Sequence, residues 1–488
     1  MQKLHELTAR ETAEKIRSKK ISAVECVQAV FKRIHKFEDE INAYVTIVEE
    51  KALKKAKIID IKISEGKTVG RLAGVPIAIK DAICTKGIPT TCSSKMLENF
   101  IPPYNAEVIE RIKQEDGVII GKTNMDEFAM GSSTETSYFG PTRNPWDLST
   151  VPGGSSGGSA ACIAASEAIL SLGTDTGGSI RCPASYCSVV GLKPTYGLVS
   201  RYGLIAYANS LEQIGPMTKD VYDCALFLSI ITGHDSKDST SVKETKKDYT
   251  KFLKDNVKGF KIGVPKEFFG EGTNQAVEKQ VWKGIHKLEE LGASCEEISL
   301  PTLEHSLATY YIIAMSEASS NLARFDGLRY GYRIAKDEKE WATVYSQDRQ
   351  IGFGTEVRRR IILGTYALSA GYYNKYYLKA LKVRTLIRND FEKAFKKFDV
   401  VIGPTMPFPP FKIGEKIEDP LSLYMSDVDT VSANLAGLPA ISIPCGFTNG
   451  LPIGMQIIAP LLREDLILQA AYTFEQNTDY QKQKPSIE

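Results

Sequence analysis

The sequence contains little histidine and no cysteine pair of the kind that binds zinc. Five histidines occur in 488 residues, and the nine cysteines are scattered, with no Cys-x-x-Cys motif among them. We therefore expect no metal site and no dithiol redox motif. The scattered, odd number of cysteines and a start without an apolar signal segment favour a reducing compartment, so we expect a cytoplasmic protein.

Excess charge and long apolar runs are also missing. The 61 Lys and Arg residues nearly balance the 59 Asp and Glu residues, which leaves a net charge of +2. Overall electrostatics therefore gives no case for direct binding to nucleic acid. No stretch approaches 18 uninterrupted apolar residues, so we expect no membrane-spanning segment.

What the chain does contain is an alternation of helix and strand patterns. Thr8-x-x-Glu11 and Ser22-x-x-Glu25 fit the capping box and predict helices in the first sixty residues. Short apolar runs at 74–80, 117–121 and 261–268 predict strands, as do three more between 398 and 460 and the alternation of Ile41, Ala43, Val45 and Ile47. The charged segment 235–254 is expected to be a surface connection. Helical periodicity dominates from about 300 to 400. This order predicts an α/β fold with a largely parallel or mixed sheet.

Two glycine-serine clusters, at 153–158 and 176–179, are the most distinctive feature of the chain. The stretch reads GGSSGGSAACIAASEAILSLGTDTGGSIR, and each cluster presents a hydroxyl, Ser155 in the first and Ser179 in the second. Gly153 to Gly157 match the G-x-S-x-G nucleophile elbow, which requires a histidine base later in the chain. The three histidines that follow lie in charged or helical surface segments, so a Ser-His-Asp triad is disfavoured.

A lysine is the remaining candidate base, and Lys80 has the most suitable surroundings. It follows the apolar run VPIAI, and burial lowers the pKa of a lysine because it penalises the ammonium. Neutrality at pH 7 needs a shift of more than about three units from roughly 10.4, or roughly 4–5 kcal/mol. A proton path would run from Ser179 through Ser155 to Lys80. The alternative is a structural lysine at a strand end, paired with Asp81.

The second cluster also supplies groups that could stabilise an oxyanion. Backbone N–H groups of Thr176, Gly177 and Gly178 carry little side-chain bulk, so they could surround the oxygen of a tetrahedral intermediate. The residues after Ser179 are predicted to be helical, which adds a favourable dipole.

GVPIAIKD, GGSSGGSAA and GTDTGGSIR, in this order, resemble the amidase signature family. The resemblance implies a Ser-Ser-Lys triad, with Lys80 as base, Ser155 as the bridging serine with a cis peptide bond, and Ser179 as acyl nucleophile. It also implies one large α/β domain over residues 1–488, with a central twisted mixed β-sheet covered by helices on both faces. Its expected parts are a helical segment (1–65), the signature core (about 66–232), a mostly helical part with substrate-binding residues (about 233–400), and strands and a helix that complete the sheet (about 400–488).

Within this family, MDEFAMGSSTETSYFGPTRNPWD, YYIIAMSEASSNLARFDGLRYG and SANLAGLPAISIPCG resemble the A subunits of tRNA-dependent amidotransferases. The resemblance implies a glutaminase that supplies ammonia to convert Glu-tRNA(Gln), in many organisms also Asp-tRNA(Asn), to the amidated form. Arg359 would hold the α-carboxylate of glutamine, Asp427 its α-ammonium, and Tyr310 would line the pocket. The alternatives are their neighbours in the sequence: Arg358 and Arg360, Asp429, and Tyr311. No cofactor is expected in this chain, because the B subunit would bind the tRNA, ATP and Mg²⁺. The C subunit would complete a heterotrimer.

Two other interpretations stay open. The first is a stand-alone amidase that acts on small carboxamides, and the second is a catalytically inactive scaffold that only organises partners. The presence of Lys80, Ser155 and Ser179 argues against the scaffold.

Overall fold

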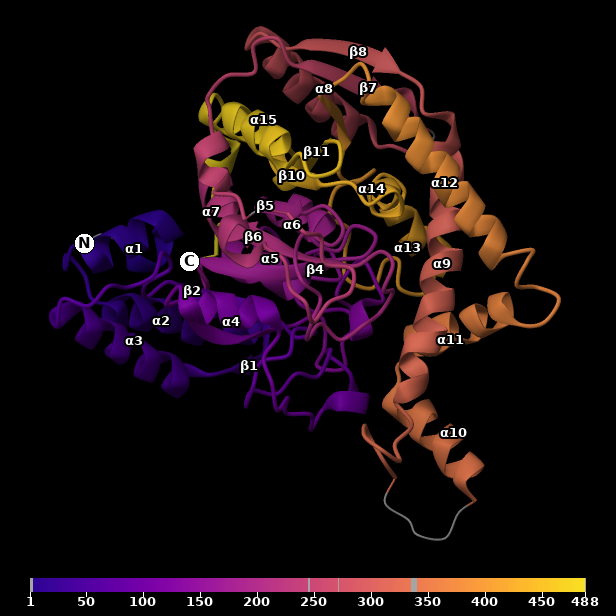
Figure 1. Ribbon diagram of the computed structural model, residues 1–488, viewed down its shortest axis with the longest axis horizontal. Coiled ribbons are helices and arrows are strands. Elements are labelled where there is room, and N and C mark those ends of the chain that lie inside the picture. The colour runs from indigo at the N-terminus through magenta and orange to yellow at the C-terminus, as the bar shows by residue number, and fades with distance from the viewer. Residues whose placement is uncertain (1–2, 245, 271, 335–339, 488) are drawn as a thin grey trace.

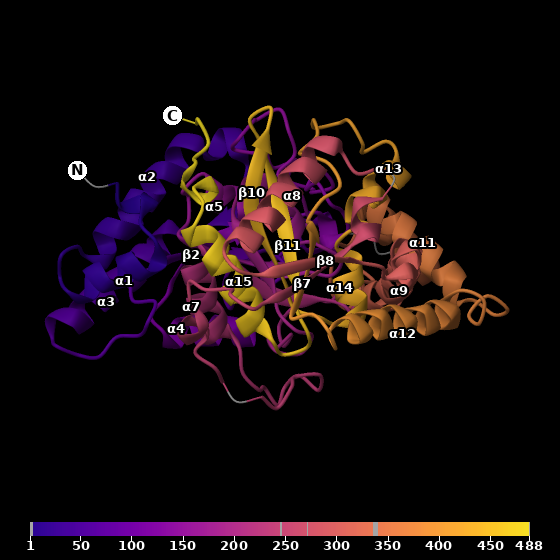
Figure 2. The same cartoon turned by 90° about the horizontal axis from the view of Figure 1, so that it is seen from above.

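One mixed sheet of eleven strands runs through the part of the chain that the computed structural model describes, residues 3–244, 246–270, 272–334 and 340–487. Helices cover the sheet on both faces (Figures 1 and 2). The strands are β1 (Tyr44–Ile47), β2 (Pro76–Lys80), β3 (Val118–Thr123), β4 (Leu170–Asp175), β5 (Val190–Lys193), β6 (Gln213–Thr218), β7 (Lys261–Pro265), β8 (Ser294–Ile298), β9 (Val400–Pro404), β10 (Ala440–Thr448) and β11 (Leu451–Ile458).

The α-helices follow the predicted order closely. They are α1 (Ala9–Arg17), α2 (Ala23–Ile41), α3 (Glu49–Ser64), α4 (Glu107–Gln114), α5 (Gly157–Ala164), α6 (Arg181–Cys187), α7 (Val221–Ile231), α8 (Gln275–Glu290), α9 (Ser306–Asn321), α10 (Trp341–Gly352), α11 (Thr355–Leu368), α12 (Tyr377–Ala394), α13 (Pro420–Tyr424), α14 (Val431–Ala436) and α15 (Glu464–Gln476). Both predicted capping boxes form, at Thr8 and at Ser22. The hydroxyl and carboxylate of each box bond the first-turn N–H groups, which fixes where α1 and α2 begin.

The strand order places the two glycine-serine clusters beside the end of β2. The order is β1-β3-β2-β4-β6-β5-β10-β11-β9-β7-β8. β2 runs parallel to both β3 and β4, so the carboxyl ends of these three strands lie at one edge of the sheet. The predicted base, Lys80, is the last residue of β2, and the second glycine-serine cluster comes directly after β4. The sheet therefore brings both to that edge.

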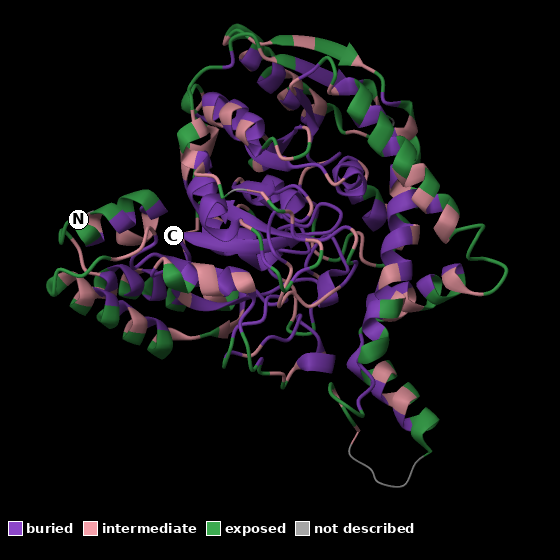
Figure 3. Cartoon of the chain, viewed as in Figure 1, coloured by how far each residue is buried: buried purple, intermediate pink, exposed green. Residues whose placement is uncertain are grey.

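The strands at the centre of the sheet and the helix faces that cover them are buried (Figure 3), and their apolar side chains form clusters between sheet and helices. One cluster joins α1, α2 and α3 to β2, β3 and β4, and another joins α7, α8 and α15 to β5, β7, β9, β10 and β11. A third cluster fixes α9, α11, α12 and α14 beside the sheet. These last helices form the lobe at the side of the molecule opposite α1–α3 (Figure 1).

Two strand predictions needed adjustment. The strand expected from Ile41 begins only at Tyr44, because α2 continues to Ile41 and Asn42 ends it in the left-handed conformation with φ 55°. The edge strand β8 was not predicted, since its sequence SCEEI has no buried residue and therefore no clear apolar alternation. Residues 335–339 of the predicted helical region, and residue 245 of the charged connection, lie outside the described residues.

None of the described helices is both long enough and apolar enough to span a membrane.

A buried ion pair holds the strand ends next to the glycine-serine clusters. Lys122 on β3 and Asp81, just after β2, are both fully buried, with Nζ 3.4 Å from Oδ1. Lys122 also donates to Thr90 Oγ1 at 2.6 Å and to the Ile83 carbonyl at 2.9 Å, and Asp81 accepts from the Thr91 N–H at 2.8 Å. Asp81 is therefore the partner of Lys122 and not of Lys80, so the paired structural role considered for Lys80 is wrong.

Lys122→Met should lower the free energy of unfolding by about 3–5 kcal/mol, because it leaves the Asp81 carboxylate buried without its cation. The double variant Lys122→Met/Asp81→Asn should recover part of that loss, since no buried charge then remains. Denaturant unfolding midpoints of the wild type and the two variants measure both effects. Equal midpoints for the wild type and Lys122→Met would contradict a structural role for this pair.

Candidate active site

Lys80 ends β2 inside a cage of hydroxyl groups. Its Nζ lies 2.7 Å from Ser155 Oγ, 2.8 Å from Ser156 Oγ and 2.8 Å from Thr174 Oγ1, with the Thr174 carbonyl at 3.5 Å. Hydroxyls accept hydrogen bonds from an ammonium, and they can also donate to the lone pair of a neutral amine. The cage can therefore hold Lys80 in either protonation state.

The hydroxyl that can exchange a proton with Lys80 is that of Ser155. Ser156 Oγ donates to the Thr174 carbonyl at 3.1 Å, so its proton is already engaged. Ser155 Oγ has no described partner other than Lys80. This difference agrees with the bridging role that the sequence resemblance implies for Ser155.

Burial makes Lys80 a base near neutral pH. Its side chain is fully buried and forms no ion pair with a described residue. Burial lowers the pKa of Lys80 to about 7, although Asp126 and Asp175 oppose this through their negative charge. A substantial fraction of Lys80 is therefore neutral at pH 7.

Asp126 shapes the first glycine-serine loop. The Gly154–Ser155 peptide bond is cis. The Asp126 N–H donates to the Ser155 carbonyl at 3.3 Å, and the Asp126 carboxylate accepts from the Thr134 N–H and the Thr136 hydroxyl, each at 2.9 Å. A side chain at Gly154 would collide with this carboxylate, so only glycine fits there. The buried Asp126 carboxylate thus fixes the loop that carries Ser155.

A second buried carboxylate, Asp175, shapes the loop that carries Ser179. Asp175 pairs with Arg181 through two hydrogen bonds of 3.0 and 3.1 Å, and it accepts from the Gly178 N–H at 2.8 Å. The pKa of Asp175 is lowered to about 2, chiefly because the Arg181 charge outweighs the cost of burial. The residues between Asp175 and Arg181 are therefore held in a tight turn. The helix predicted after Ser179 is α6, which begins at Arg181.

This turn decides which N–H groups are available to an oxyanion. The Gly178 N–H is engaged by Asp175, whereas those of Thr176, Gly177 and Ser179 bond no described acceptor. Of the three residues predicted for the oxyanion hole, Thr176 and Gly177 therefore keep free donors, and Ser179 adds its own. Gly178 contributes instead by lacking a side chain, because a Cβ there would collide with Thr430.

Ser179 lies beside the first loop and is only 8% exposed. Its carbonyl accepts from the Ser156 N–H at 3.2 Å, which joins the two glycine-serine clusters. Within the described residues, no hydrogen bond connects the hydroxyls of Ser179 and Ser155. The proton relay between them stays a prediction, and catalytic hydrogen bonds of this kind often tighten only when substrate binds.

Tyr310 and Asp427 both reach the Ser179 loop. The Tyr310 ring lies directly against Gly177, where any side chain would collide with it. Thr430 Oγ1 donates to the Gly177 carbonyl at 2.6 Å and also contacts the Asp427 carbonyl at 3.1 Å. The Asp427 carboxylate, 7% exposed, accepts from Tyr311 at 2.6 Å and from Ser132 at 2.8 Å. Asp427 is therefore joined to the Ser179 loop through Thr430, and its carboxylate bonds Tyr311, whose ring packs against that of Tyr310.

Arg359 is linked to Tyr311 through Glu356 and Tyr424. The Tyr424 ring stacks on that of Tyr311 at 4.2 Å, and its hydroxyl donates to Glu356 at 2.6 Å. Glu356 in turn forms ion pairs with Arg359 and Arg360. The Arg359 side chain is 37% exposed and has no other described partner, so it keeps donors for a ligand.

Arg360 is the structural neighbour of Arg359. It is buried, donates to Tyr207 at 2.9 Å, and lies over the rings of Tyr311 and Tyr424, 5.3 Å from each centroid. Its groups are engaged inside the protein, so Arg359 stays the predicted carboxylate ligand. The sequence offers Arg360 only as an alternative to Arg359, although Glu356-x-x-x-Arg360 is a signal for a helical ion pair. Ser156 and Thr174 were not predicted, because they lie near predicted site residues but carry no sign of the cage.

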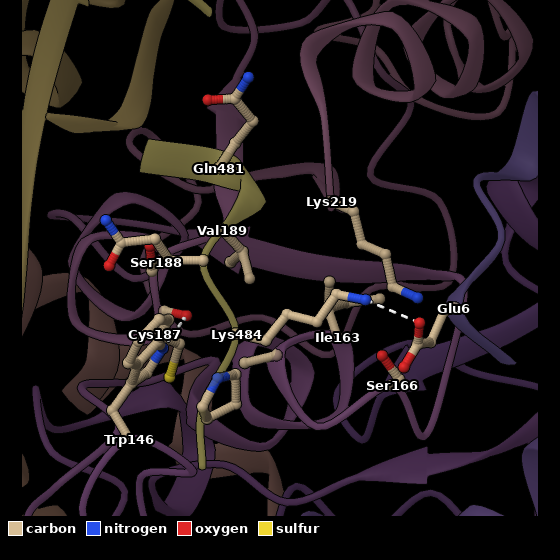
Figure 4. A pocket seen from close by; sticks show the side chains of 13 residues that line it. Glu6, Trp146, Ile163, Ser166, Cys187, Ser188, Val189, Lys219, Gln481 and Lys484 are labelled. Carbon is tan, nitrogen blue, oxygen red and sulfur yellow. Dashed lines mark hydrogen bonds and ion pairs between the residues drawn. The ribbon is translucent and has the colours of Figure 1, made fainter. Parts of the chain in front are cut away.

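A small cavity of about 70 Å³ lies apart from this site, against the C-terminal residues, lined by Trp146, Cys187, Lys219 and Lys484 among others (Figure 4). There Lys484 pairs with Glu6 at 2.7 Å. No group of three or more His, Cys, Asp or Glu side chains among the described residues is arranged to hold a metal ion.

Comparison with known proteins identifies the class to which this fold and this triad belong. A sequence model of the amidase family matches residues 25–468, so the chain belongs to the amidase family. The resemblance drawn from the three sequence motifs is thereby confirmed, as is the single α/β domain with a mixed sheet.

Particular members of the family are highly similar along nearly the whole chain. The A subunit of glutamyl-tRNA(Gln) amidotransferase from Methanosarcina barkeri is 64% identical over 448 residues, which is 92% of this chain and 93% of that protein. The crystal structure of the corresponding A subunit from Thermotoga maritima is 40% identical, with a TM-score of 0.79 over 97% of this chain and 95% of that one. A bacterial aryl acylamidase of the amidase signature family is 27% identical, with a TM-score of 0.85 over 98% of each chain.

The rate of amide hydrolysis should depend on the protonation of Lys80. Because the base must be neutral and its pKa is about 7, kcat/KM should fall about tenfold per pH unit below that value and level off above it. Asp126→Asn removes an anion that raises the pKa of Lys80, so it should move the acidic limb to lower pH. A profile that is flat from pH 5.5 to 9 would contradict the lysine base.

Arg359→Gln should raise KM for glutamine by about tenfold to a hundredfold while kcat changes little, because a charge-assisted hydrogen bond to the substrate carboxylate is worth about 1.5–3 kcal/mol. Arg358→Gln, on the same helix, is the matched control and should leave KM near the wild-type value. Steady-state kinetics with glutamine measures both. An unchanged KM in Arg359→Gln would show that Arg359 does not bind the substrate carboxylate.

Proposed function

We propose that this protein hydrolyses glutamine as the ammonia-supplying component of a tRNA-dependent amidotransferase. The observation that carries the proposal is Lys80 in its hydroxyl cage, together with the contacts that link the Ser179 loop to Asp427 and Arg359. Tyr310 and Tyr311 join the loop to Asp427, and Tyr424 and Glu356 extend the contacts to Arg359. A free amino acid carries an ammonium and a carboxylate, so opposite charges near an amidase nucleophile suit a glutamine substrate. The names and the high identity of the amidotransferase relatives support the same activity.

Acylation would begin with attack of Ser179 Oγ on the side-chain carboxamide carbon of glutamine. The Ser179 proton passes to Ser155, whose own proton passes to Lys80 Nζ. The carbonyl oxygen becomes an oxyanion next to the free N–H groups of Thr176, Gly177 and Ser179, which are fixed before the reaction and so need no reorganisation. The C–N bond then breaks, and the departing nitrogen takes a proton back along the same path and leaves as ammonia.

Deacylation would repeat these steps with water. Neutral Lys80, acting through Ser155, removes a proton from a water that attacks the γ-glutamyl ester on Ser179. The ester C–O bond breaks, Ser179 recovers its proton, and glutamate leaves. One glutamine and one water therefore yield one glutamate and one ammonia, and the enzyme is restored.

The ammonia would be used elsewhere in the assembly. We propose a heterotrimer in which the B subunit binds the tRNA, ATP and Mg²⁺, the C subunit completes the assembly, and Glu-tRNA(Gln) or Asp-tRNA(Asn) is amidated. The near-zero net charge of this chain agrees with a division of labour in which the tRNA is bound mainly by another chain. We propose that the assembly works in the cytoplasm.

A stand-alone amidase is the second candidate, and the similarity of the fold to a bacterial aryl acylamidase favours it. The two functions differ in their requirements for the substrate. A glutaminase needs the charged ends of glutamine, whereas an amidase of small carboxamides turns over uncharged amides with comparable efficiency.

Ser179→Ala should abolish glutamine hydrolysis and covalent labelling by a glutamine-like electrophile, because it removes the attacking oxygen. In the enzyme assembled with its partner chains, ammonium salts should restore amidation of Glu-tRNA(Gln) by this variant. Ser166→Ala, at the small cavity of Figure 4, is the matched control and should retain wild-type activity. Labelling that persists in Ser179→Ala would show that another residue is the nucleophile. Failure of ammonium to restore amidation would contradict the ammonia-supplying role.

A further inference from the structure

The hairpin formed by α11 and α12 presents an apolar surface that the fold does not cover. The rings of Tyr366, Tyr372 and Tyr376 are 37–48% exposed, and Ile362 and Leu363 on α11 are exposed by 68% and 44%. Single exposed apolar residues are ordinary, but a contiguous group of this kind marks an interaction site. The hairpin projects from the side of the molecule opposite α1–α3 (Figure 1).

The three tyrosines form a preorganised group, which we call the tyrosine cluster. The centroids of Tyr366 and Tyr372 are 4.5 Å apart, and Tyr376 lies 5.9 Å from each of them. The rings pack on one another rather than in the core. Because this packing restricts their rotamers before any partner arrives, binding loses little side-chain entropy.

The charge around the tyrosine cluster has one sign. From residue 357 to residue 389 the sequence contains eight Lys and Arg residues and no Asp or Glu. Lys375, Lys379 and Lys382 form no ion pair with a described residue, and Lys375 Nζ lies 5.8 Å from the Tyr372 ring centroid. An acidic rim on the partner would complement these lysines.

A protein fits this surface better than a nucleic acid does. Five of the eight cations are engaged by the chain itself: Arg358 by Thr355, Arg359 and Arg360 by Glu356, Arg384 by Leu435 and Ser210, and Arg388 by Glu392. Binding to RNA depends on neutralising many phosphates, and three lysines supply little of that. Exposed Ile362 and Leu363 beside tyrosines match the apolar centre of a protein interface.

We propose that the tyrosine cluster, with Ile362 and Leu363, docks another protein of the assembly, whose contacting face is apolar at its centre and acidic at its rim. The inference rests on the function proposed above, which requires an assembly with other subunits. It assigns the outer face of the α11–α12 hairpin to contact with one of them, while the same two helices pack their inner faces on α9.

The test compares how tightly variants of the purified chain bind the other subunits, co-expressed from the same genome, by calorimetric titration. Tyr366→Ser/Tyr372→Ser should weaken binding about tenfold or more, because tyrosines at interface centres carry much of the affinity. Lys375→Glu/Lys379→Glu should weaken it too, and more so at low salt. Ile58→Ser/Ile61→Ser, on exposed positions of α3 at the opposite side, is the matched control and should bind like the wild type.

Glutamine hydrolysis by the isolated chain reports whether each variant is folded, since none of these residues belongs to the active site. If the tyrosine variant fails to fold, the lysine variant still decides the question. Unchanged affinity in the folded variants overturns the proposal. So does a loss of tRNA binding or of self-association that leaves the affinity for the other subunits intact. A wild-type chain that binds none of the other subunits overturns the proposed function, and this proposal with it.

Discussion

The structure depends on one physical constraint, the burial of Lys80 without a counter-ion. The three hydroxyls around Nζ satisfy its hydrogen bonds but do not neutralise its charge, so burial lowers its pKa to about 7. The neighbouring Lys122 shows the contrast, because it is equally buried but lies 3.4 Å from Asp81. Two lysines at adjacent strand ends thus have different roles: one is held by an anion, and the other is left able to accept a proton.

Two buried carboxylates fix the loops that carry Ser155 and Ser179. Asp126 contacts Gly154 and Thr134 and so shapes the loop of Ser155, while Asp175 binds Arg181 and Gly178 and so shapes the loop of Ser179. Both carboxylates are fully buried and lie close enough to affect the charge of Lys80. The groups that set the geometry of the site therefore also set its electrostatics, which limits how far either can be changed independently.

Much of this could be predicted from the sequence, for local reasons. Some signals depend only on neighbouring residues, such as the capping boxes at Thr8 and Ser22 and the apolar run before Lys80. The structure confirms the two helices and the strand that these signals predict. The resemblance of three motifs supplied the family and the triad. The contacts of Asp126 with Gly154, of Glu356 with Tyr424 and of Arg360 with Tyr207 could not be predicted in this way, since they join segments that are distant in sequence. The unpredicted strand β8 lies at the sheet edge, where few side chains are buried and apolar alternation disappears.

The central claim is that Lys80 is neutral over much of the physiological pH range, and its protonation can be observed directly. Protein labelled with ¹³C at the lysine ε-carbon can be titrated by NMR, with the Lys80 signal assigned by its absence in Lys80→Met. The account predicts a midpoint near pH 7. A Lys80 signal that titrates only near pH 10, as an exposed lysine does, would show that the ammonium persists at neutral pH and would contradict the account.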